Sequence, residues 1–136
     1  MGSDVLPSRS LIGVILIGGI FELVMGFAVL AWGDLIVSLA TGMTTIPSYS
    51  LYWRTMGVLA MALGSLQIVA ARDPQRYIAV PVAACLVRFF LPVLTGIQVL
   101  ETPSMATALI LSTAFDFILA LATLILLHRD GLIARR

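Results

Sequence analysis

Three charged side chains, Glu22, Arg88 and Asp116, stand near the middle of three different apolar stretches of membrane length. A charge at bilayer depth costs about 2.5–3.5 kcal/mol on insertion scales, so such residues pair with one another or line a protected interior. One arginine can bind two carboxylates, which would leave the trio with one net negative charge that a single proton neutralises. The chemistry open to these residues is ion pairing, proton handling or binding of a polar ligand.

The chain around these charges is strongly apolar. Of its 136 residues, 60% are hydrophobic and only 11% are charged. Four stretches reach the roughly 20 residues that a membrane-spanning helix needs. These are residues 11–32, 51–71, 77–100 and 104–127. We therefore predict one domain, residues 1–136, that is an all-α integral membrane protein with an antiparallel bundle of four transmembrane helices. Residues 33–50 are predicted to form a short amphipathic segment in the membrane interface.

The basic residues predict the orientation of this bundle. All eight are arginine, and six of them lie at the N-terminus, in the connection around residues 72–76 and at the C-terminus. Because cytoplasmic segments are enriched in basic residues, both termini are predicted to be cytoplasmic. The arginines are explained by this topology, so no nucleic-acid partner is expected.

Small residues recur at helical spacing on the predicted helices. Gly18 and Gly26 flank Glu22 at intervals of four, and Gly57 and Gly64 lie on one stripe of the second helix. Lipid supplies no hydrophobic drive for helix association, so close backbone approach at small residues must contribute much of it. These four glycines, together with Pro92 of the third helix, are predicted helix-packing positions.

Two further residues extend the candidate site, and a proline lies close to it in the sequence. Gln67 and Arg54 share the stripe of small residues on the second helix. Arg54 can reach inward to the charged trio or extend to the lipid headgroups. Pro92, four residues after Arg88, removes the hydrogen bond to the Arg88 carbonyl and produces either a simple bend or a polar notch.

The chain lacks the residues of several kinds of chemistry. Its only histidine, His128, lies at the end of the fourth stretch, and its only cysteine is Cys85. A single histidine rules out bis-histidine haem ligation within one chain, and one cysteine rules out an intrachain disulfide or dithiol. No glycine-rich phosphate loop is present. We expect no enzyme activity, no metal site and no covalently bound cofactor.

Several of these features together resemble small four-helix bacterial membrane proteins of the DoxX-like type. They are Glu22 followed by Gly26, the runs YWRTMG and AARDPQR at the two ends of the second helix, Arg88 and Asp116. The resemblance implies a compact protein of the bacterial inner membrane, cytoplasmic or intracytoplasmic, associated in some relatives with quinone-linked oxidoreductases. It also implies that Glu22, Arg88 and Asp116 are a shared polar core, and that quinone or lipid is the candidate ligand.

Three functions are compatible with this sequence. The leading hypothesis is an accessory subunit of a larger, energy-transducing membrane complex, respiratory or photosynthetic, that binds other integral-membrane subunits and lipid and has no catalysis of its own. The second is a small transporter or proton-coupled carrier, homo-oligomeric, with a mid-membrane Glu/Arg/Asp site. The third is a quinone- or lipid-binding protein. Whether the charges lock the helix register or form a working site stays open.

Overall fold

The computed structural model describes residues 6–41, 47–101 and 106–133, and all regular structure in these ranges is helical. The helices are α1 (Arg9–Thr41), α2 (Pro47–Ala70), α3 (Ala79–Glu101) and α4 (Ala106–Arg129). By length and composition, α1, α3 and α4 each contain a stretch able to cross a membrane. The predicted all-helical, membrane-type fold with four helices is confirmed. The apolar run of α2, Arg54–Ala70, is shorter than the other three.

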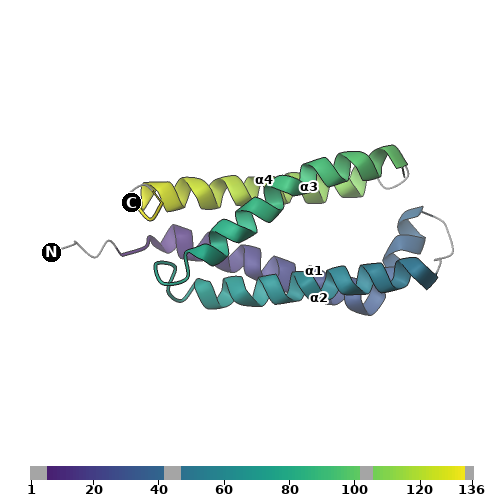
Figure 1. The fold of residues 1–136 in the computed structure, drawn as a ribbon, viewed down its shortest axis with the longest axis horizontal. Coiled ribbons are helices and arrows are strands. Elements are labelled where there is room, and N and C mark those ends of the chain that lie inside the picture. Colours follow the sequence, from purple (N-terminus) through teal and green to yellow (C-terminus); the bar gives the residue numbers. More distant parts are fainter. Residues whose placement is uncertain (1–5, 42–46, 102–105, 134–136) are drawn as a thin grey trace.

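The first helix is longer than predicted. It was expected to end at Trp32, but helical structure continues to Thr41, with a kink where Trp32 leaves helical dihedral angles (φ −131°, ψ 19°). Residues 33–41 contain no proline, so the helical hydrogen bonding can resume after the kink. The last turns of α1 consequently turn away from the α2 axis (Figure 1). The rest of the expected interfacial segment includes residues 42–46, which lie outside the described ranges.

The connection between α2 and α3 is a compact turn that contains an acidic cap. Asp73 Oδ1 accepts a hydrogen bond from the Arg76 nitrogen at 3.1 Å, and the Asp73 carbonyl accepts one from the Tyr77 nitrogen at 3.1 Å. A carboxylate accepting from the backbone three residues later is the usual arrangement of a helix N-cap. Here the capped helical turn precedes Ala79, where α3 itself begins.

The four helices form two hairpins of unequal tightness. α1 and α2 run antiparallel and in close contact, whereas α3 begins beside α2, crosses obliquely and ends beside α4 (Figure 1). The two hairpins lie together at the end where α1 begins and α4 ends, and they diverge toward the opposite end (Figure 1). The four helices of the predicted antiparallel bundle are therefore arranged as a splayed pair of hairpins.

Two pairs of glycines hold the first hairpin together. A Cβ on Gly26 would lie 2.6 Å from the Gly57 carbonyl oxygen, and one on Gly57 would lie 2.7 Å from the Gly26 carbonyl oxygen. The same reciprocal contact joins Gly19 and Gly64, at 2.9 and 2.6 Å. Both pairs are backbone against backbone, so no side chain fits at any of these positions. We call these four residues the glycine seam.

The joined end of the hairpins is sealed by apolar side chains. Leu11, Ile15, Ala71 and Leu127 form a core that is at most 5% exposed. Outside it, Ser8 begins α1: its hydroxyl accepts a hydrogen bond from the Leu11 nitrogen at 3.2 Å, and its own nitrogen donates to Asp130 Oδ2 at 2.7 Å. The start of α1 is thus fastened to the end of α4.

Candidate functional site

A hydrogen-bonded triangle joins three helices at the centre of the molecule. Arg88 Nη2, on α3, donates to Glu22 Oε1 of α1 at 2.6 Å and to Gln67 Oε1 of α2 at 3.3 Å. Gln67 Nε2 donates in turn to Glu22 Oε2 at 2.5 Å. Each side chain binds the other two, so the triangle fixes the relative register of α1, α2 and α3.

Asp116, on α4, joins this triangle more loosely. Its Oδ1 lies 3.4 Å from Arg88 Nε, and Arg88 Nε is buried without a hydrogen-bond partner. The Arg88 side chain is 3% exposed, whereas the Glu22 and Asp116 side chains are 12% and 16% exposed. The structure thus brings together the three predicted charges and Gln67, with Asp116 as the least tightly held member. We call these four residues the charged cluster.

Gly18 provides the space for the guanidinium. It lies one turn before Glu22 on α1, and a Cβ there would be 2.9 Å from Arg88 Nη2 and 3.2 Å from Gln67 Oε1. The sequence assigned Gly18 to helix packing together with Gly26, Gly57 and Gly64. The last three do lie in the glycine seam, but the fourth seam position is Gly19, and Gly18 instead faces the charged cluster.

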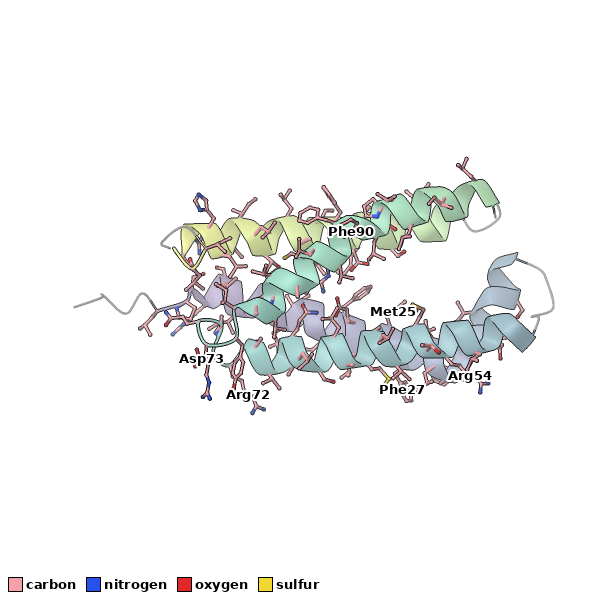
Figure 2. All side chains as sticks on the ribbon, in the orientation of Figure 1. Met25, Phe27, Arg54, Arg72, Asp73 and Phe90 are labelled. Carbon is pink, nitrogen blue, oxygen red and sulfur yellow. The ribbon has the colours of Figure 1, made fainter. Side chains whose placement is uncertain are left out.

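Arg54 lies outside the charged cluster, contrary to its place in the predicted network. It is near the open end of α2 and forms an ion pair with Asp34 at 3.7 Å, with the two side chains 60% and 40% exposed (Figure 2). Arg54 lies thirteen residues before Gln67 on α2, about 20 Å along the helix axis, which is too far for it to join the charged cluster. Pro92 lies inside α3, which remains one helix from Ala79 to Glu101.

The sequence did not single out several contacts around the site. Thr95 and Thr113 share a hydrogen bond of 2.6 Å between α3 and α4. The rings of Phe21 and Phe115, each one residue before a carboxylate of the cluster, lie 4.6 Å apart at an interplanar angle of 55°. The signal in the sequence for this ring contact was the phenylalanine that directly precedes each carboxylate.

An apolar hollow lies on the first hairpin, where Met25 and Gly26 are one turn of α1 beyond Glu22. Its volume is about 150 Å³, and its lining is almost entirely nonpolar. The lining residues are Met25, Gly26, Val29, Met56, Gly57 and Ala60. In Figure 2, Met25 lies on the side of the first hairpin that faces α3 and α4. Met25 and Met56 remain 42% and 38% exposed. We call this hollow on the first hairpin, lined by these six residues of α1 and α2, the wedge.

The arrangement offers ion pairing and hydrogen bonding at a depth where water is scarce. Within the described part of the chain, no group of three histidine, cysteine or acidic residues is placed to hold a metal ion. Cys85 is buried and donates weakly to the Ala120 carbonyl at 3.5 Å. What the site presents is one buried cation shared by two carboxylates, with Asp116 only partly satisfied.

Comparisons of the chain with protein-family models, with curated proteins and with solved structures found no match.

Proposed function

We propose that this protein is a small integral-membrane accessory subunit, without catalysis of its own, that receives a transmembrane helix of a larger bacterial inner-membrane complex in its wedge. The observation that carries this proposal is the divergence of the two hairpins. It leaves apolar side chains such as Met25 and Met56 about 40% exposed beside the bundle centre. Close packing rather than hydrophobicity drives helix association in lipid, and a hollow flanked by the small residues Gly26, Gly57 and Ala60 lets a partner's helix approach closely.

The charged cluster supports a structural role within such a subunit. Arg88 is 3% exposed and its Nη2 is held by both Glu22 and Gln67. A site that loads and releases an ion must exchange such contacts, whereas a network that sets helix register keeps them. The network therefore holds the first hairpin to α3 while leaving the wedge open.

Mild-detergent extraction tests this function. The tagged chain should leave the membrane with other integral-membrane subunits, and deleting it should lower the yield of that assembly without abolishing its chemistry. Single cysteines at Met25 or Met56 should cross-link to a partner helix, whereas one at Phe27, on the opposite side of the first hairpin in Figure 2, should not. Purification alone, without cross-links from Met25, would contradict the proposal.

The proposal includes a topology with α2 as the fourth span and both termini in the cytoplasm. α2 packs along α1 through the glycine seam, and α1 has the length to cross the bilayer. Reporter fusions after Arg136 and between Arg72 and Arg76 should therefore read cytoplasmic, and one near Thr44 external. A cytoplasmic signal at Thr44 would refute this topology.

A proton-coupled carrier is the second candidate, and one observation favours it. The bundle is sealed at one end by the core around Leu11 and Leu127, which are both 0% exposed, and it diverges at the other (Figure 1). Access from one side to mid-membrane carboxylates is a feature of carriers. Reconstituted vesicles would then show flux that is lost in Glu22→Gln.

A further inference from the structure

We propose that the partner helix in the wedge carries one basic side chain that pairs with Asp116. This inference rests on the proposed function and adds the chemistry of the partner to it. Its basis is the charge of the cluster together with the apolar hollow that begins one turn of α1 beyond Glu22.

The charges of the cluster do not balance within the chain. Glu22 and Asp116 bring two negative charges, and Arg88 brings one positive charge. Among the described residues of the first hairpin, Arg54 is paired with Asp34 and is 60% exposed at the open end, and Arg9 is the first residue of α1. An unbalanced charge at membrane depth is costly, so a positive charge from outside the chain would stabilise the site.

Asp116 is the member of the cluster that can accept this charge. Glu22 uses both of its oxygens, one with Arg88 and one with Gln67. Among the described residues, the ion-pair contact of Asp116 is the 3.4 Å approach to Arg88 Nε, where the donor lacks a hydrogen bond. A carboxylate held by one long ion pair, with its side chain 16% exposed, retains an oxygen for a second cation.

The lining of the wedge favours a basic side chain on an apolar helix over a free inorganic cation. The side chains that line the hollow, those of Met25, Val29, Met56 and Ala60, offer a hydrated ion no ligands. A helix brings its own apolar side chains to cover this surface and delivers the charge already shielded from lipid. Methionine side chains adapt readily to the shape of such a partner.

Synthetic transmembrane peptides test this inference on the full chain. Three peptides of about 21 leucines and alanines would carry lysine, glutamine or leucine at the central position and a dansyl group at one end. Binding in lipid vesicles would be measured by energy transfer from the chain's own tryptophans, Trp32 and Trp53. Trp32 lies at the kink of α1 and is 54% exposed.

We expect the lysine peptide to bind the wild-type chain at least ~10-fold more tightly than the glutamine peptide, a size typical of close charge pairs away from water. Asp116→Asn should reduce this preference to less than about two-fold. Asp116→Glu, which keeps the charge, and Asp34→Asn, which removes a carboxylate elsewhere, should both retain it.

Three results would overturn the inference. Equal binding of all three peptides to the wild-type chain would show that the wedge accepts a helix but reads no charge, and the proposed function would survive. A lysine preference unchanged by Asp116→Asn would place the contact elsewhere. Failure of every peptide to bind, while native subunits still co-purify, would show that partners dock outside the wedge. The peptide series on the unmodified chain does not depend on any variant folding.

Discussion

The glycine seam makes a quantitative prediction about stability. Replacing Gly26 with alanine puts a methyl group 2.6 Å from the Gly57 carbonyl oxygen and 2.8 Å from the Met61 nitrogen. Both neighbours are backbone atoms, so the helices must separate rather than a side chain rotate. Overpacking of this kind costs about 1–3 kcal/mol, against a gain of about 1 kcal/mol in helix propensity when alanine replaces glycine.

The chain supplies matched controls for this substitution. Gly13 on α1 and Gly96 on α3 have nothing within 4 Å of an added Cβ. Gly13→Ala and Gly96→Ala should therefore keep the propensity gain and stabilise the protein by up to about 1 kcal/mol. The predicted difference between Gly26→Ala and Gly13→Ala is about 1–3 kcal/mol, with Gly26→Ala the less stable.

Unfolding by sodium dodecyl sulfate in mixed micelles, followed by circular dichroism, measures this difference. Gly57→Ala should resemble Gly26→Ala, because the two residues meet reciprocally. In the double variant the losses should not add fully, since separating the helices for one methyl group makes room for the other. Equal stability of Gly26→Ala and Gly13→Ala would refute the close backbone contact on which the first hairpin is built.

Three further predictions concern single contacts. Arg88→Leu leaves the Glu22 carboxylate buried without a cation and should cost about 3–5 kcal/mol of stability in the same unfolding assay. The double change Glu22→Gln with Arg88→Gln should cost less, and equal stability of Arg88→Leu and the parent would refute the network. Gly18→Ala should cost only about 1 kcal/mol, because the end of a flexible guanidinium can move away from the new methyl group; a loss as large as that of Arg88→Leu would show that the guanidinium has no room. Burial raises the pKa of Asp130, but the hydrogen bonds from Ser8 and the charge of Arg129 outweigh this effect and hold the pKa below its usual value. The ionised carboxylate therefore stabilises the fold above the usual aspartate pKa, and this stabilisation is lost as pH falls through the lowered value. The stability difference between the parent and Asp130→Asn should vanish at low pH, and a difference independent of pH would contradict this.

The helical class and the contact among the charged side chains could be predicted from the sequence. Stretches of about 20 apolar residues leave few alternatives to membrane helices. Charges at mid-membrane need partners, so Glu22, Arg88 and Asp116 were expected to lie together, and the structure places them so. Gln67 followed from its position on the stripe of small residues.

The way in which the helices of each hairpin pack could not be predicted from the sequence, for a physical reason. α1 is apolar on nearly every side, so its pattern does not indicate which face meets a neighbour. Gly18 and Gly19 are adjacent and equally small, and only the partner helix decides that Gly19 joins the seam and Gly18 faces Arg88. The equal seven-residue spacing of Gly19 with Gly26 and of Gly57 with Gly64 was the available signal.

The glycine seam also bears on how the chain enters the membrane during synthesis. In the topology proposed above, α2 has the shortest apolar run, Arg54–Ala70, and carries Gln67 within it. Such a helix partitions poorly into lipid by itself. α1 is synthesised first, and its Gly19 and Gly26 form the surface on which the backbone of α2 packs at Gly64 and Gly57. α2 would therefore leave the translocation channel already paired with α1, as the second arm of a preassembled hairpin, and α3 would later find the Glu22 and Gln67 side chains in place to capture Arg88.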